Sequence, residues 1–265
     1  MGEHAIAFAL VIAAWWIGTG LLILCCAQSR TVSVAGAAVI AALFGVSLAG
    51  ISFTAEAVTT LSVYGAFVSA LSLWAGVEYT FLAGLITGPH RDPCPEDAGA
   101  WQRFRLAVMA LLYHEVLILV CAAAVIALAW GSENQIGVLT FLILAVMRIS
   151  AKLNIFAGVP YFTDSYMPVK LSYLKTYYRR RNVGLLFLTT MTGAIVTTGI
   201  VGRAAYLAEG PLAIGFSLLA TLLALAIIEH LFMIMPFSDA VFWRWAQRQT
   251  GKPPAQSAKT PALPV

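Results

Sequence analysis

Charged residues are scarce in this chain. Asp, Glu, Lys and Arg make up 11% of its 265 residues, whereas hydrophobic types make up 60% and the mean hydropathy is +0.86. A soluble domain carries about 25% charged residues, so this chain has too little polar surface to cover itself in water. The composition excludes a soluble globular enzyme and predicts an integral membrane protein.

Several chemical motifs are also missing. The four cysteines form no C-x-x-C pair, which argues against a disulfide framework or a zinc module. The chain contains no glycine-rich phosphate loop, no H-E-x-x-H and no G-x-S-x-G motif. The net charge of +4 is small, and we expect no nucleic-acid partner.

Long apolar runs are abundant instead. A helix of about 20 residues crosses the hydrocarbon core of a bilayer, and several stretches have this length and character. We expect seven spans, at 5–27, 32–55, 58–86, 106–130, 137–160, 183–201 and 212–235. The sequence therefore predicts an all-α, polytopic helical bundle in one domain over residues 1–249. The Pro-, Ala- and Lys-rich residues 250–265 are expected to form a disordered cytoplasmic tail.

The basic residues favour one side of this bundle. Thirteen of the 16 Lys and Arg residues fall in the connections and tail on a single side. The opposite ends carry acidic residues instead, namely Glu3, Glu56, Glu133 and Glu209. Because cytoplasmic connections of membrane proteins are enriched in Lys and Arg, we expect a periplasmic N-terminus and a cytoplasmic C-terminus in the bacterial inner membrane, with the lipid bilayer as solvent.

Two predicted cytoplasmic connections have distinctive sequences. Residues 88–105 form a polar, Pro-rich loop that ends in an interface anchor at Trp101 and Arg103. Residues 161–182 contain LSYLKTYYRRRN, which we expect to lie along the membrane surface as an amphipathic segment. This segment is either a simple positive-inside anchor or a docking surface for a protein partner or anionic lipid. The residues of this surface are Lys175, Tyr177, Tyr178, Arg179, Arg180 and Arg181.

Ionisable residues also occur inside the predicted spans, where they are costly and often functional. Counting 1.5 Å per helical residue from the span ends places most of them roughly 8 to 14 Å from the cytoplasmic edge. We therefore expect a single polar layer shared by four helices. Its members are Glu78, His114, Glu115, Arg148, Lys152, Asn154, Glu229 and His230.

Several interpretations of this layer stay open. It is a salt-bridge network that fixes helix register, a metal site such as a di-iron centre, or a tetrapyrrole site with a histidine as axial ligand. Proton or ion transport is a further alternative. Two histidines each adjoin a glutamate, about 100° away around the helix, which disfavours one shared metal centre. The candidate metal or tetrapyrrole ligands are Glu78, His114, Glu115, Glu229 and His230.

Longer motifs resemble a known family. These motifs are ITGPHRDPCP, RFRLAVMALLYHE, MRISAKLNIFAGVPYF, YLKTYYRRR and EHLFMIMPFSDAVFWRW. With them, the chain resembles the PuhE-type photosynthetic complex assembly family of anoxygenic phototrophic bacteria, from the first span to about Trp245. One departure follows Pro160, where relatives tend to read Asn-Leu with an acidic run and this chain has Tyr161-Phe162-Thr163-Asp164.

The resemblance implies both a cellular process and a membrane location. It implies a role in assembling the photosynthetic apparatus or in modulating bacteriochlorophyll synthesis, in the inner photosynthetic membrane. Reaction-centre or light-harvesting subunits and pigment-synthesis enzymes are the implied partners. We therefore expect a protein that binds or delivers a bacteriochlorophyll-type tetrapyrrole. A membrane metalloenzyme acting on a lipophilic substrate and a passive assembly scaffold are the alternatives.

Overall fold

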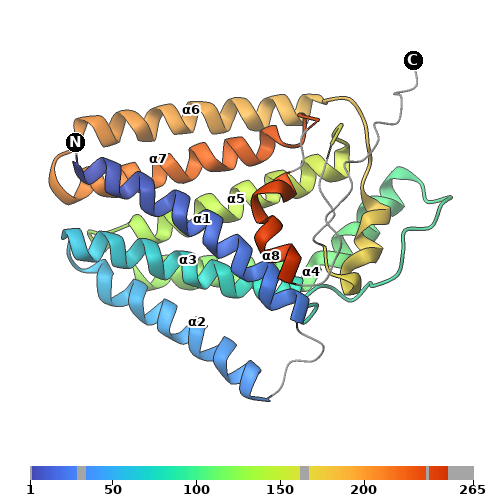
Figure 1. Ribbon diagram of the computed structural model, residues 1–265, viewed down its shortest axis with the longest axis horizontal. Helices are drawn as coiled ribbons and strands as arrows, with labels where there is room; N and C mark the ends of the chain where they lie inside the picture. The colour runs from blue at the N-terminus through green and yellow to red at the C-terminus, as the bar shows by residue number, and fades with distance from the viewer. Residues whose placement is uncertain (1, 29–33, 162–166, 237–238, 250–265) are drawn as a thin grey trace.

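Helices account for 79% of the chain that the structure describes (Figure 1). The computed structural model describes residues 2–28, 34–161, 167–236 and 239–249. The predicted tail at 250–265 lies outside them. The long helices are α1 (Gly2–Gln28), α2 (Val34–Ala55), α3 (Thr60–Leu82), α4 (Ala100–Leu128), α5 (Ile136–Ala157), α6 (Leu185–Leu207) and α7 (Gly210–Leu231). The short ones are η1 (Val169–Tyr177), η2 (Asp239–Trp243) and α8 (Arg244–Gln249).

The seven predicted spans are confirmed, since seven described helices are long and apolar enough to cross a membrane. The main difference is at α4, which begins at Ala100 and not at the predicted residue 106. The charged sequence there resembled a loop. It is helical because Arg103 lies on the same helix face as Ala110 and His114 and is buried with them against the protein.

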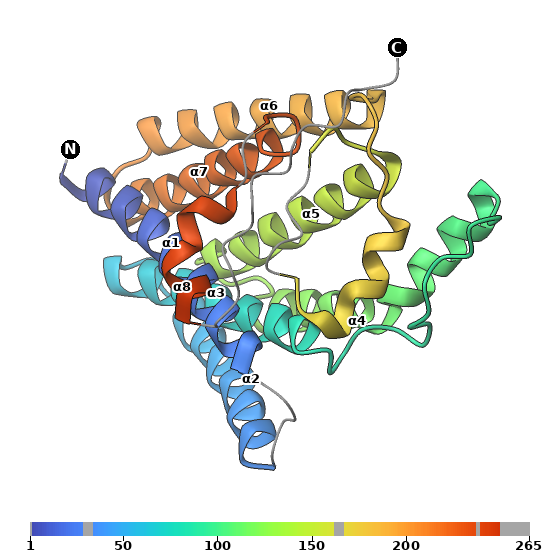
Figure 2. The ribbon, with the colours of Figure 1, turned by 45° about the vertical axis from the view of Figure 1, so that its right-hand side comes forward.

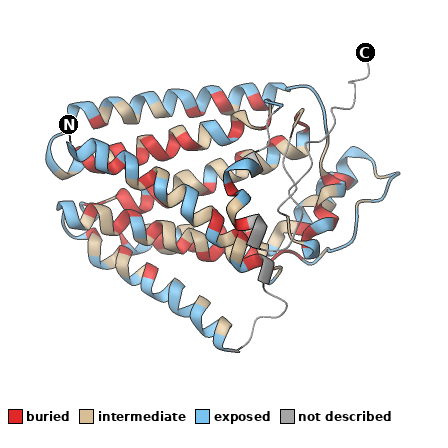
Figure 3. Ribbon diagram, in the orientation of Figure 1, coloured by how far each residue is buried: buried red, intermediate tan, exposed pale blue. Residues whose placement is uncertain are grey.

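Three helices form the centre of the bundle. Helices α3, α5 and α7 contact one another, while α1 packs on α7, α2 on α3 and α6 on α7. Figure 2 shows α4 diverging from the rest of the bundle toward the loop that precedes it. The buried residues concentrate on α3 and α7, whereas α2 and α6 are mostly exposed (Figure 3). The centre of the bundle is therefore the place where polar groups can be shielded from lipid.

Apolar packing holds the helices together on both sides of this centre. One group of buried side chains joins α1, α3 and α7 and includes Val11, Phe67 and Leu218. A second joins α3, α4 and α5 and includes Leu73 and Phe141. Since lipid tails are as apolar as these side chains, close van der Waals packing stabilises the contacts more than hydrophobic burial does.

The helix ends have local causes in the sequence. Helix α3 begins with a capping box, in which Thr59 and Ser62 exchange side-chain to backbone hydrogen bonds of 3.1 and 2.8 Å. Helix α5 ends before Gly158, because the φ of 123° at this residue is incompatible with a right-handed helix. The N-terminus of α1 lies at one end of the bundle, and η1 with the loop after α3 lies at the other (Figure 1).

Candidate functional site

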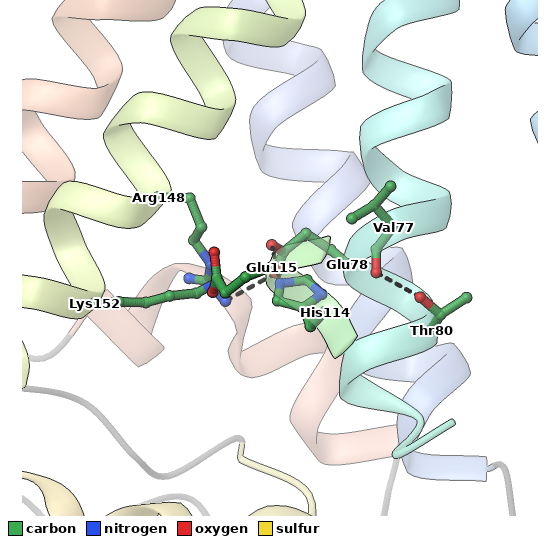
Figure 4. A network of polar contacts seen from close by, with 7 residues as sticks. All are labelled: Val77, Glu78, Thr80, His114, Glu115, Arg148 and Lys152. Carbon is green, nitrogen blue, oxygen red and sulfur yellow. Dashed lines mark hydrogen bonds and ion pairs between the residues drawn. The ribbon is translucent and has the colours of Figure 1, made fainter. Parts of the chain in front are cut away.

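An ion-pair cluster joins α3, α4 and α5. Nη2 of Arg148 lies 2.8 Å from Oε2 of Glu78, and Nζ of Lys152 lies 2.6 Å from Oε1 of Glu115. Nε2 of His114 lies 3.7 Å from Oε1 of Glu78. Figure 4 shows the two basic side chains reaching from α5 toward the two carboxylates and the imidazole. Five of the predicted layer residues therefore do meet.

The charges of this ion-pair cluster balance. Two carboxylates face two basic groups, and the imidazole adds no charge when it is neutral. Glu78 is buried, whereas Arg148, Lys152 and Glu115 are each partly accessible. A single charge in the membrane interior is far more costly than a pair. The pairing allows three apolar helices to carry four ionisable groups and ties them together in one register.

His114 occupies the most enclosed position in the cluster. Its side chain is 0% exposed, and its ring stacks on Phe81 at 4.4 Å between centroids. Neither ring nitrogen makes a hydrogen bond. Its backbone N–H donates to the carbonyl of Thr87, in the loop that returns against α4, at 2.9 Å. A metal binds an imidazole nitrogen in the plane of the ring, and Oε1 of Glu78 already lies 3.7 Å from Nε2 in this fully enclosed setting. A tetrapyrrole at His114 would therefore require neighbouring groups to move.

A second group, the hydroxyl-amide cluster, joins α5, α6 and α7. Nδ2 of Asn154 donates to the carbonyl of Ser150 at 2.9 Å and to Oγ1 of Thr190 at 3.1 Å. Oγ of Ser150 lies 3.0 Å from Nε2 of His230, and Nδ1 of His230 lies 2.9 Å from the carbonyl of Ala226. Both ring nitrogens of His230 therefore have a polar partner. The imidazole of His230 is the one titratable group in this cluster, whose other side chains are hydroxyls and an amide.

Helix α5 separates the two clusters. Residues four apart lie on one face of a helix, and residues two apart lie about 200° from each other. Arg148 and Lys152 therefore face α3 and α4, whereas Ser150 and Asn154 face α6 and α7. The sequence placed these residues in a single layer. The structure distributes them over two opposite faces of α5, so they form two clusters and not one site.

Glu229 belongs to neither cluster. Its side chain is exposed, and Oε1 accepts a 2.6 Å hydrogen bond from Nε1 of Trp15 in α1. The neighbouring His230 is buried on a different face of α7. The two residues diverge because adjacent positions point about 100° apart on a helix.

The candidate ligands do not fit a di-metal centre. Among the described residues, no three His, Cys, Asp or Glu side chains come together as they would around a metal ion. Glu78 and His114 are the two candidates that approach each other, and Arg148 already holds that carboxylate. A metal cation at this carboxylate would have to displace the guanidinium.

The Tyr- and Arg-rich segment is folded into the protein more deeply than the sequence suggests. Leu171, Leu174 and Tyr177 of η1 are buried against α3 and α4. The prediction that Tyr177 belongs to an open surface is therefore wrong, because its ring packs inward and its hydroxyl donates to the carbonyl of Asp92 at 3.1 Å. Burial, with the nearby Cys94 thiol, raises the pKa of Tyr177 to about 12.

The rest of that surface is divided. Arg180 and Arg181 are exposed, and Lys175, Tyr178 and Arg179 are half-buried. Their side chains are at least partly accessible, although η1 itself is anchored in the bundle. Whether they bind a partner stays a prediction.

Sequence reasoning missed the structural role of Arg103. Its guanidinium donates to the carbonyls of Phe156, at 3.0 Å, and Tyr177, and it lies 4.2 Å from the centre of the Phe156 ring. It thereby ties α4 to the end of α5 and to the end of η1. A signal was present, since Arg103 and His114 are 11 residues apart, which is close to three helical turns. That signal appears only once α4 is known to start at Ala100.

These features define a polytopic α-helical membrane protein with an ion-paired centre. The family model described as "Protein of unknown function (DUF3623)" matches residues 1–254. A similar protein, the "Uncharacterized 30.4 kDa protein in puhA 5'region" of Rhodobacter capsulatus, is 35% identical over 259 residues, which are 95% of this chain and 92% of that protein. The chain belongs to the DUF3623 family, consistent with a PuhE-type protein of the photosynthesis gene cluster. No solved structure matches it.

Proposed function

We propose that this protein is an assembly scaffold for the photosynthetic apparatus in the inner membrane of an anoxygenic phototrophic bacterium. The observation that carries the proposal is the relative in the puhA 5′ region of Rhodobacter capsulatus, which matches nearly the whole chain. The resemblance to PuhE-type assembly proteins supports the same role. The partners are reaction-centre or light-harvesting subunits, or enzymes of pigment synthesis.

The polar clusters act in this proposal as internal locks. The ion-pair cluster ties α3, α4 and α5, and the hydroxyl-amide cluster ties α5, α6 and α7. Hydrogen bonds between membrane helices fix register where lipid offers no competing partners. A rigid bundle keeps the apolar faces of α2 and α6 in place, and these faces are the ones available to helices of a partner.

The positive-inside rule supports the orientation in this proposal. Arg91 lies in the loop after α3, Arg105 near the start of α4 and Lys170 in η1. That loop and η1 are at the end of the bundle opposite the N-terminus (Figure 1). Connections rich in Lys and Arg stay in the cytoplasm. In this proposal the scaffold presents η1 and the arginines that follow it to the cytoplasm.

Deletion and complementation in the native host test this function. Loss of the gene is expected to reduce the near-infrared absorbance of assembled pigment complexes, and the wild-type gene is expected to restore it. For a scaffold, the variants Glu78→Gln and Asn154→Ala should reduce absorbance in proportion to the amount of protein in the membrane. An unchanged spectrum after deletion would contradict the assembly role. Lost absorbance at undiminished protein abundance would contradict the scaffold mechanism.

One observation favours a second candidate, binding of a bacteriochlorophyll-type tetrapyrrole. Both ring nitrogens of His114 are without hydrogen bonds in a buried setting, and a neutral imidazole is a good axial ligand for a central metal. Protein purified from the phototrophic host should then carry a pigment absorption band. His114→Ala should remove that band, whereas His230→Ala, which alters a hydrogen-bonded imidazole, should retain it. Colourless wild-type protein would refute this candidate.

A further inference from the structure

Two arginines converge at the end of α5. The chain after Gly158 runs beside residues 179–181, where the Val159 N–H donates to the Arg179 carbonyl at 3.2 Å and the Arg181 N–H donates to the Val159 carbonyl at 3.3 Å. Alternate side chains of an extended segment share one face. Arg179 and Arg181 therefore lie together, and the stem of Arg181 packs directly over Gly158.

A third arginine lies behind them. Arg103 is buried beneath this segment, held by the carbonyls of Phe156 and Tyr177, and the charges of Arg179 and Arg181 both act on it. No carboxylate in the described part of the chain forms an ion pair with any of the three. The site is thus a concentration of positive charge that the described residues leave unbalanced, unlike the neutral ion-pair cluster deeper in the bundle.

An aromatic row leads from these arginines to the lipid. The Phe156 ring, which lies under the Arg103 guanidinium, contacts Phe104 at 5.7 Å between centroids, and Phe104 stacks on Trp101 at the same separation. Trp101 is 74% exposed at the start of α4. Because tryptophan is enriched at the level of the lipid headgroups, this row marks the depth of the arginines. A ligand there meets positive charge at one end and aromatic surface at the other.

We propose that Arg179, Arg181 and the Trp101–Phe104 surface bind an anionic phospholipid. The phosphate accepts hydrogen bonds from Arg179 and Arg181, whose planar guanidinium groups match phosphate oxygens. Arg103 is a positioning residue, since it holds the end of η1 against α5 and adds positive charge from behind. The acyl chains lie along Phe104 and Trp101. Basic pockets between helices on the cytoplasmic side of membrane proteins commonly hold anionic headgroups. This binding site is independent of the scaffold function proposed above.

Lipid retention by purified full-length protein tests the site. Delipidated protein in a neutral detergent is incubated with dioleoyl phosphatidylglycerol, and bound lipid is counted by native mass spectrometry. Since each arginine near the membrane surface contributes about 1 kcal/mol to the binding of anionic lipid, we expect affinity to fall about fivefold in Arg179→Gln and in Arg181→Gln. The double variant should lose about 25-fold. Both side chains reach the surface, so each single variant also serves if the double variant does not fold.

The matched control is Arg203→Gln, which removes the same charge from an exposed position near the opposite end of α6. Its affinity should equal that of the wild type, and Trp101→Ala should weaken retention without any change in charge. Equal loss in Arg203→Gln would overturn the proposal, because only net charge would then matter. Equal retention of phosphatidylcholine, or full displacement by glycerol 3-phosphate, would overturn it as well, since the site would then lack preference for an anionic lipid or for its acyl chains.

Discussion

Arg148 and Glu78 join α5 to α3 through a 2.8 Å charge-assisted hydrogen bond between residues 70 positions apart in the chain. The carboxylate that Arg148 holds also faces the imidazole of His114, whose nitrogens make no hydrogen bond. This single carboxylate therefore connects three helices. Its negative charge balances a basic group on α5 and faces the most enclosed polar side chain on α4.

Glu78→Gln should destabilise the bundle strongly. The substitution keeps the size of the side chain but removes the charge that balances Arg148. Breaking one side of a fully buried ion pair costs about 3 kcal/mol, and the partial exposure of Arg148 should reduce this cost. We expect a clear fall in the unfolding free energy measured by titration with sodium dodecyl sulfate in mixed micelles.

The double variant Glu78→Gln/Arg148→Gln distinguishes this cause from lost packing. It removes both charges together and should recover part of the loss, because neither charge is then left without its counterion. If the loss of unfolding free energy in the double variant equals the sum of the losses in the two single variants, the ion-pair role is contradicted.

Gly88→Ala should prevent correct packing of the loop after α3 onto α4. A Cβ atom at Gly88 would lie 2.1 Å from the carbonyl oxygen of Met109 and 2.5 Å from the carbonyl carbon of Ala110. Both are backbone atoms of α4 and cannot rotate away. We expect a large fall in folded yield by size-exclusion chromatography, together with loss of the Thr87 contact to the His114 N–H.

Gly99→Ala is the control for this loop. A Cβ atom there meets nothing within 4 Å, so we expect wild-type yield. A stable Gly88→Ala protein that elutes like the wild type would show that the loop does not rest on α4 as described.

Gly20→Ala should displace the C-terminal helix α8 from α1. The new Cβ would lie 2.1 Å from Cζ2 of Trp245, whose ring covers Gly20. Two indole hydrogen bonds stabilise the same contact. Trp16 of α1 donates its indole N–H to the carbonyl of Phe242 at 2.9 Å, and Trp243 donates its own to the carbonyl of Trp16 at 3.0 Å. We expect faster proteolytic cleavage near residue 244 and a shift in tryptophan fluorescence.

Gly18→Ala provides the comparison two positions earlier on another face of α1, since its Cβ meets nothing within 4 Å. Its cleavage rate should match that of the wild type. If both variants are cleaved at the wild-type rate, the packing of Trp245 over Gly20 contributes nothing to the attachment of α8.

Tyr177 should make the stability depend on pH in the alkaline range. Its pKa is raised to about 12, from an ordinary value of 10, mainly by burial in η1. A group whose pKa is higher in the folded state contributes stability that is fully present below pH 10 and is lost as the pH rises toward 12. Thermal unfolding in detergent should therefore show a falling midpoint over this range, and the Tyr177→Phe variant should show a smaller fall. Identical slopes in the two proteins would contradict the prediction.

Much of the site was visible in the sequence. Glu78, His114, Glu115, Arg148 and Lys152 could be predicted to share a depth, because residue counts along helices convert directly into distance across the bilayer. Their partners could not be predicted. Whether Lys152 pairs with Glu115 depends on which helices are neighbours and how they are rotated, and apolar spans of similar hydropathy carry no signal of either.

Tryptophan shows the same limit. Trp101, Trp130 and Trp243 all lie at or just outside the ends of apolar runs, where tryptophan is typical of the membrane interface. The structure leaves the first two mostly exposed, whereas Trp243 is 2% exposed against α1. The local sequence around each tryptophan gives the same expectation. Trp243 is buried because the C-terminal segment contacts α1, more than 200 residues earlier in the chain.

The number of spans and their helical character were determined by composition and length, because a backbone in lipid must satisfy its own hydrogen bonds and does so by forming helices across about 20 apolar residues. The division of the polar residues was decided by tertiary structure alone. Helix α5 turns Arg148 and Lys152 toward α3 and α4, and Ser150 and Asn154 toward α6 and α7. One layer in sequence thereby becomes two separate clusters in space, because a buried charge is stable only beside its counterion and the packing of neighbouring helices determines where that counterion lies.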